Sequence, residues 1–178
     1  MPWKSLATLK KQSRLAMPEF GIIVQARMAS IRSPGKVAHE ILGKPMLFHL
    51  LKRLETWGHE NLLVATTTMQ ADDLVAEIAK IAGVKCFRGD VDDVMKRYIE
   101  AAEFLEVTNV IRVGGDDPLI DPVGVQALIE AQTAQPYDFY YASHKEGWIY
   151  GTAAELVTVS ALKKGDRKST RLNSSHQI

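Results

Sequence analysis

Short, uninterrupted apolar runs recur along the middle of the chain, and each is bounded by polar or turn-forming residues. Runs of this length are typical of strands that are buried in a parallel sheet. Five clear runs and a weaker sixth lie at Phe20–Gln25, Asn61–Thr66, Val84–Phe87, Asn109–Val113, Tyr137–Tyr141 and Glu155–Val159. We predict a strand at each of these positions.

The segments between these runs carry apolar residues at the spacing of one helix face. Over Met46–Trp57 the stripe is Leu47, Leu50, Leu51 and Leu54. Three further helices are predicted from the stripes Leu74, Val75, Ile78 and Ala82, then Val91, Val94, Tyr98, Ala102 and Leu105, then Val125, Leu128 and Ile129. Strands that alternate with helices in this way predict right-handed βαβ units and an α/β fold with a mostly parallel sheet.

Acidic residues stand where these helices are expected to begin. Asp90 suits an N-cap, and Asp121–Pro122 suits an N-cap followed by a proline at N1. Asp72–Asp73 and Asp92–Asp93 are interpreted as acids near helix N-termini, where the helix dipole favours negative charge. For Asp92 and Asp93, a role in a binding site is kept as the alternative.

Composition and charge narrow the class of protein. The chain has 178 residues, of which 46% are hydrophobic, enough for one domain with a core. No apolar run reaches the roughly 18 residues of a membrane helix, so no membrane span is expected. Cys86 is the only cysteine, which excludes an internal disulfide and fits a reducing, cytoplasmic setting. Residues 1–18 and 166–178 hold seven basic and one acidic residue, and the remaining 15 basic and 20 acidic residues argue against a nucleic-acid partner.

The two ends of the chain lack the periodicity of the middle. Residues 1–18 are expected to be a disordered or spurious leader, because no apolar stretch of a secretory signal is present. Asp166–His176 reads DRKSTRLNSSH and resembles the translation of a common sequencing-library adapter. We expect one domain over residues 19–165, truncated at its C-terminus, and a non-native tail over 166–178.

Three cations follow the first predicted strand, where ligands bind in a parallel sheet. Arg27, Arg32 and Lys36 lie within ten residues, with no acid among them. Guanidinium groups fork onto phosphate oxygens, and Gly35 lets backbone N–H groups approach a ligand. The chain has neither a GxxxxGK[ST] nor a GxGxxG pattern, so the loop predicts a different kind of polyanion site, with a solvated basic loop as the alternative.

An acidic turn follows the fourth predicted strand. Gly114 and Gly115 leave room for a ligand, and Asp116 and Asp117 offer oxygen ligands. Magnesium prefers one or two carboxylates together with phosphate oxygens. The turn therefore predicts a metal site opposite the cationic loop, with a hydrogen-bonded turn that closes the strand as the alternative. Asp121 is assigned to the helix cap.

These two loops resemble the bacterial sugar cytidylyltransferases, which include the CMP-Kdo and acylneuraminate enzymes. The subgroup associated with spore coat polysaccharide biosynthesis is the most similar. The shared motifs, in order and spacing, are IIVQARMASIRSPGK (Ile22–Lys36), GKPM (Gly43–Met46), VATTT (Val64–Thr68), FRGDVDDVMKRY (Phe87–Tyr98) and GGDDPLID (Gly114–Asp121). The similarity runs from Phe20 to Leu162.

The resemblance implies a three-layer α/β/α fold of the nucleotide-diphosphosugar-transferase type. It also implies magnesium-dependent transfer of CMP from CTP to a sugar acid or related sugar, with release of pyrophosphate, in the synthesis of surface-polysaccharide precursors. Asp116 matches the metal-binding aspartate, and Arg27 and Lys36 are the expected catalytic residues. The residues expected at the nucleotide are Arg27, Arg32, Gly35, Lys36, Thr66, Arg97 and Gly115. Members commonly form homodimers, which is the expectation here.

Two departures from the family keep alternatives open. Ala153 stands where members often have an acid in a glycine-led strand, and a second metal carboxylate would fall beyond Gly165. One alternative is a nucleotide-diphosphosugar glycosyltransferase, although the Arg-x4-Arg-x3-Lys spacing favours a triphosphate over a diphosphate. The other is a catalytically inactive nucleotide-binding module.

Overall fold

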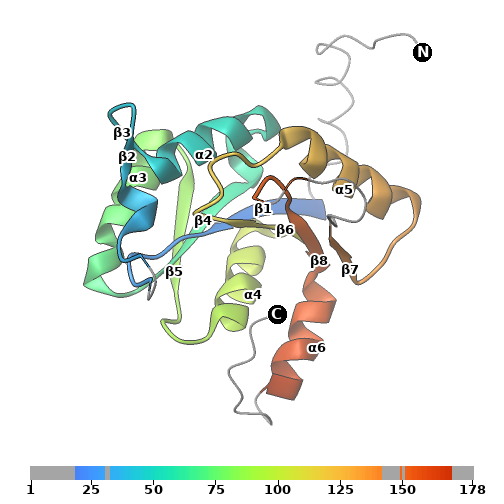
Figure 1. The fold of residues 1–178 in the computed structure, drawn as a ribbon. Coiled ribbons are helices and arrows are strands. Elements are labelled where there is room, and N and C mark those ends of the chain that lie inside the picture. The colour runs from blue at the N-terminus through green and yellow to red at the C-terminus, as the bar shows by residue number, and fades with distance from the viewer. Residues whose placement is uncertain (1–18, 31–32, 142–148, 150, 170–178) are drawn as a thin grey trace, which may run out of the picture.

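A computed structural model describes residues 19–30, 33–141, 149 and 151–169 (Figure 1). Its main feature is one six-stranded sheet with the strand order β5-β4-β1-β6-β8-β7. In chain order the strands are β1 (Phe20–Gln25), β4 (Leu62–Thr67), β5 (Lys85–Gly89), β6 (Asn109–Gly114), β7 (Phe139–Tyr141) and β8 (Glu155–Thr158). Strands β5, β4, β1 and β6 are parallel, whereas β8 and β7 pair antiparallel. The prediction of a mostly parallel sheet is confirmed.

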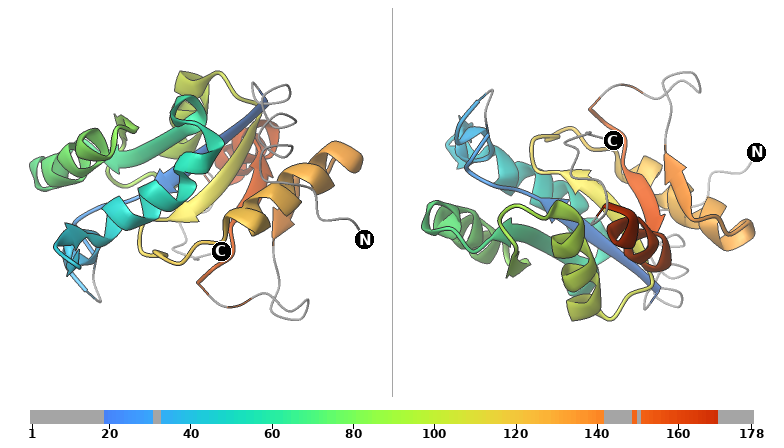
Figure 2. Two further views of the ribbon diagram at one scale, coloured as in Figure 1. Left: turned by 90° about the horizontal axis from the view of Figure 1, so that it is seen from above. Right: turned by 90° about the horizontal axis from the view of Figure 1, so that it is seen from below.

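Helices cover both faces of this sheet, as the two views of Figure 2 show. On one face, α2 (Met46–Leu54), α3 (Asp73–Ala82) and α5 (Pro122–Ala134) contribute to a core that includes Leu50 and Ile78. On the other face, α4 (Val94–Leu105) and α6 (Val159–Ser169) contribute to a second core around Ile23 and Tyr98. Alternate residues of β1 supply both cores, because successive side chains point to opposite faces. The expected three-layer α/β/α arrangement is confirmed.

Short elements complete the described part of the chain. They are the 3₁₀ turns η2 (Lys36–Ala38), η3 (Glu55–Trp57), η4 (His59–Asn61) and η5 (Gln70–Asp72), and the hairpin strands β2 (Glu40–Ile41) and β3 (Lys44–Pro45). The hairpin was not predicted. Its two turn residues, Leu42 and Gly43, have φ values of 50° and 73°. Two positive φ values are typical of a type I′ turn, but a leucine in place of the usual asparagine or aspartate conceals the signal.

The predicted start of α4 was wrong. The Asp90 side chain accepts hydrogen bonds from the backbone N–H groups of Asp92 and Asp93, both at 3.0 Å, and so closes a turn before the helix. Asp93 is the N-cap, because its side chain accepts the N–H of Lys96 at 2.8 Å. Val91 therefore lies outside the helix. By contrast, the predicted cap at Asp121 is confirmed, with a bond of 2.9 Å from the N–H of Val123.

One further expectation differs from the structure. Leu74 is 47% exposed, since the buried stripe of α3 is formed by Val75, Ile78, Ala79 and Ala82. Helix α6 runs through Gly165 to Ser169, and residues 1–18 and 170–178 lie outside the described part, so the expected domain bounds stay a prediction. In the described residues, no helix has both the length and the apolar character needed to cross a bilayer.

Cys86 lies in β5 and packs against the core on the α2 and α3 side of the sheet. The pKa of its thiol is raised to about 11, mainly because the thiol is removed from water. The positive charge of Arg88 opposes this rise, and the negative charge of Asp72 adds to it. A thiol reacts with alkylating agents as the thiolate, so its reactivity falls as its pKa rises.

We therefore predict that iodoacetamide modifies Cys86 of the folded protein at pH 8 at least about tenfold more slowly than Cys86 of the urea-unfolded chain. The chain has no other cysteine, so mass spectrometry of the intact protein measures this rate directly. Equal rates in the two states would contradict the buried position of the thiol.

Candidate functional site

The strand order places two loops side by side at the carboxyl edge of the sheet. From β1 the chain moves outward through β4 and β5, and it then returns to β6 on the other side of β1. The strand order thus reverses between β1 and β6. In open α/β sheets, ligands bind beyond the carboxyl ends of the strands at such a point. The cationic loop follows β1, and the acidic turn follows β6.

Gly115 allows these two segments to touch. Its N–H donates to the carbonyl of Gln25 at 2.8 Å. A Cβ atom at this position would lie 2.8 Å from that carbonyl oxygen and 2.8 Å from Cβ of Ala26. From the sequence, a ligand is expected to approach Gly115 closely. In the structure, the end of β1 makes this close approach instead.

Lys36 and Asp116 meet beyond the carboxyl ends of β1 and β6. Gly35, with φ 72°, turns the chain into η2, and Lys36 is the first residue of that turn. The Lys36 ammonium forms an ion pair with the Asp116 carboxylate, 80 residues away in sequence. Their side chains are 28% and 43% exposed, so both groups are open to a ligand. The structure thus brings together one predicted cation and the predicted metal ligand.

Arg27 and Arg97 add positive charge to the same edge. Arg27 is exposed just beyond β1. Arg97 is only 1% exposed and donates from Nη1 to the backbone carbonyl of Asp90. Burial lowers the pKa of Arg97, and repulsion from the Arg27 charge lowers it further. Nε and Nη2 of Arg97 are buried and have no hydrogen-bond partner among the described residues.

The remaining predicted nucleotide residues are less closely grouped. The Thr66 hydroxyl is buried and lacks a hydrogen-bond partner within the described part of the chain. Strand alternation places Thr66 on the same face as Val64, which packs with α2 and α3, whereas Arg97 comes from α4 on the opposite face. Arg32 lies outside the described residues.

The carboxylates of the acidic turn could coordinate a metal ion that takes its remaining ligands from a bound molecule. Burial, followed by repulsion from Asp116, raises the pKa of Asp117 to about 6, and the Lys36 charge opposes this rise. Among the described residues there is no cluster of three or more metal-binding side chains. Two adjacent carboxylates suit a magnesium ion that takes its other ligands from phosphates and water, rather than a site built by the protein alone.

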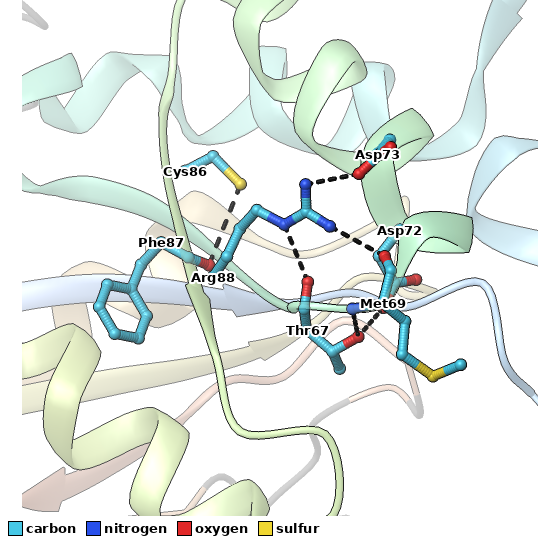
Figure 3. Close-up of polar contacts among 7 residues, drawn as sticks. All are labelled: Thr67, Met69, Asp72, Asp73, Cys86, Phe87 and Arg88. Carbon is cyan, nitrogen blue, oxygen red and sulfur yellow. Dashed lines mark hydrogen bonds and ion pairs between the residues drawn. The ribbon is translucent and has the colours of Figure 1, made fainter.

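Sequence reasoning missed a polar network beside the cationic loop, shown in Figure 3. Arg88 donates to the backbone carbonyls of Thr67 and Met69, at 3.0 and 2.8 Å, and forms an ion pair with Asp73 at 2.5 Å. Asp72 lies at the N-terminus of α3, as predicted, and in addition its side chain accepts the backbone N–H of Met28 at 2.7 Å. The only signal was its place soon after the carboxyl end of β4.

Comparisons with known proteins identify the family of this chain. Residues 21–178 match the family described as cytidylyltransferase. The chain belongs to the cytidylyltransferase family. It is similar to the spore coat polysaccharide biosynthesis protein SpsF of Bacillus subtilis, with 31% identity over 151 residues, which cover 82% of this chain and 62% of that protein.

Solved structures of cytidylyltransferases share the fold. One from Leptospira borgpetersenii is 34% identical with a TM-score of 0.78, covering 84% of this chain and 64% of that one. A CMP:2-keto-3-deoxy-manno-octonic acid synthetase complexed with CTP is 20% identical with a TM-score of 0.64, covering 84% and 78%, and supports the fold alone. This cytidylyltransferase-family chain spans less than two thirds of the length of SpsF and of the Leptospira enzyme.

Two neighbouring glycines allow a matched test of the contact between the loops. Gly115→Ala is expected to destabilise the protein by about 1–3 kcal/mol, because its Cβ meets backbone atoms of β1. Gly114→Ala is expected to cost less, since its Cβ meets the movable ends of Asp116 and Asp117. Urea unfolding of both variants measures the difference, and equal costs would contradict the tight packing at Gly115.

Proposed function

We propose that the domain transfers CMP from CTP to a sugar acid or related sugar and releases pyrophosphate. The observation that carries this proposal is the meeting of Lys36 and Asp116 at the point where the strand order reverses. The family membership and the sugar-related relative support the reaction class. A cytoplasmic location stays a prediction from the single cysteine, and a homodimer stays a prediction from the resemblance.

The Lys36–Asp116 ion pair is suited to exchange partners when a nucleotide binds. A partly exposed ion pair contributes only about 0–1 kcal/mol, because water solvates both charges well. A triphosphate carries more negative charge than one carboxylate and therefore competes well for Lys36. Asp116 would then be free to hold a magnesium ion, which would supply positive charge to neutralise the phosphates.

The residues of this chain would act by positioning and charge compensation. The sugar oxygen attacks the α-phosphorus in line, and the bond to the pyrophosphate oxygen breaks. We infer that Lys36 and Arg27 would offset the charge that grows on the leaving pyrophosphate. Nε and Nη2 of Arg97, which have no hydrogen-bond partner among the described residues, would supply further donors for the nucleotide. Donors held in place before binding cost little to reorganise during the reaction.

Nucleotide binding without turnover is the second candidate. Ala153 replaces the acid that members often carry, and the next acid, Glu155, forms an ion pair with Arg112 at 2.8 Å. No third carboxylate joins Asp116 and Asp117 in the described residues. Calorimetry with CTP and magnesium would then show binding, while an assay for pyrophosphate would show no release.

Replacing Lys36 should impair the reaction without unfolding the protein. We predict that Lys36→Ala lowers turnover at least about tenfold, roughly 1.4 kcal/mol of transition-state stabilisation. Lys44→Ala is the matched control, because Lys44 is an exposed lysine in the nearby hairpin, 5.6 Å from the centroid of the Phe48 ring. Pyrophosphate release from CTP measures both variants, and equal turnover in Lys36→Ala and the parent protein would remove Lys36 from the mechanism.

The substrates are found by the same assay. Four nucleoside triphosphates are tested with magnesium against acidic and neutral sugars, and release of pyrophosphate is expected with CTP and one class of sugar. A glycosyltransferase would instead use a nucleotide sugar and release no pyrophosphate. If calorimetry shows no CTP binding in the presence of magnesium, both the transferase and the binding module are excluded.

A further inference from the structure

We propose that Asp72 is a positioning residue that holds the cationic loop in its nucleotide-binding conformation. This inference rests on the proposed function, because it assigns Asp72 to the same site. Asp72 lies at the end of η5, outside the two loops that carry Lys36 and Asp116. It acts through the backbone of the cationic loop and does not touch the substrate.

Asp72 is a buried carboxylate with two specific partners. Asp72 is only 2% exposed. One oxygen, Oδ1, accepts the backbone N–H of Met28 at 2.7 Å, and the other, Oδ2, accepts the hydroxyl of Thr67. Hydrogen bonds to an ionised group are roughly twice as strong as neutral ones. A carboxylate buried in this way fixes the position of Met28 rather than merely filling space.

Met28 passes this constraint to the rest of the loop. Its carbonyl accepts the N–H groups of Ser30 at 3.0 Å and Gly35 at 2.9 Å. The second bond closes the loop on itself directly before Lys36. The chain of contacts therefore runs from Asp72 through Met28 and Gly35 to Lys36, whose ammonium faces Asp116.

The segment that carries Asp72 is itself held firmly. Figure 3 shows Arg88 reaching from β5 to the backbone of Thr67 and Met69, on the stretch that leads into η5. The Thr67 hydroxyl, besides donating to Asp72, accepts the N–H of Met69 at 3.2 Å. Asp72 thus connects the cationic loop to the fixed ends of β4 and β5.

Charge strengthens this assignment. Arg27 and Arg97 are close enough to repel each other, which opposes the gathering of cations that a triphosphate needs. Asp72 is a negative charge near Arg97 and offsets part of that repulsion. The positions of the cations therefore depend on Asp72 through both a hydrogen bond and its charge.

Three variants separate positioning from general stability. Asp72→Ala removes the acceptor of the Met28 N–H, whereas Asp72→Asn keeps Oδ1 and can donate from Nδ2 to the Thr67 hydroxyl. Asp73→Ala is the matched control, because Asp73 is the next residue, has a side chain that is 60% exposed and pairs only with Arg88 among the contacts described above. Each variant is checked for folding by thermal unfolding before it is compared.

The first measurement is hydrogen exchange of the Met28 amide without nucleotide, and the second is the Kd for CTP with magnesium by calorimetry. Asp72→Ala is expected to raise the exchange rate and the Kd each by at least about tenfold, as loss of a buried charge-assisted bond implies. Asp73→Ala is expected to stay within about threefold of the parent protein. Asp72→Asn keeps the acceptor for the Met28 N–H but loses the negative charge, so its exchange rate and Kd are expected to lie between those of Asp72→Ala and of the parent protein.

An unchanged Met28 exchange rate, or an unchanged Kd for CTP, in folded Asp72→Ala would overturn the proposal. Equal weakening in Asp73→Ala would also overturn it, because the effect would then be a general loss of stability. If Asp72→Ala does not fold, Asp72→Ser replaces it, since a serine hydroxyl is too short to reach Met28. Failure of the parent protein to bind CTP would count against the proposed function, whereas the exchange measurement tests the Asp72–Met28 contact independently.

Discussion

The contact between Lys36 and Asp116 depends on the order of strands in the sheet. Because β1 and β6 are parallel neighbours, the loop after one and the turn after the other emerge at the same edge. Gly115 then lets the turn approach β1 so closely that a single Cβ atom would collide with its backbone. The ion pair is weak by itself, but it marks the place where a cation and a carboxylate are held within reach of one ligand.

The main strands and helices could be predicted from sequence because their patterns are local. β1 and the cap of α5 at Asp121 follow from apolar runs and capping chemistry within a few residues. The predicted start of α4 was wrong because two nearby aspartates both suit an N-cap. Asp90 closes a turn, whereas Asp93 caps the helix. The β2–β3 hairpin was missed because a leucine adopts a backbone conformation that usually calls for asparagine or glycine.

The site could be predicted only in part, for a related reason. Lys36 and Asp116 were recognisable because each follows a predicted strand, and the fold rule brings such segments together. Asp72 also follows a strand, β4, but its proposed role could not be predicted, since that role depends on a bond to a residue 44 positions earlier in the sequence. The burial of Arg97, two of whose nitrogens have no hydrogen-bond partner in the part of the chain that the structure describes, likewise depends on how α4 packs on the sheet. Contacts of this kind are set by tertiary packing and leave no trace in local periodicity.

The most direct test of the account is a crystal structure of the protein with CTP and magnesium. We expect the triphosphate between the loop after β1 and the turn after β6, with Lys36 on phosphate oxygens and the metal ion on Asp116. The Lys36–Asp116 ion pair should be opened in that complex. A nucleotide bound at another edge of the sheet, with this ion pair intact, would contradict the central claim.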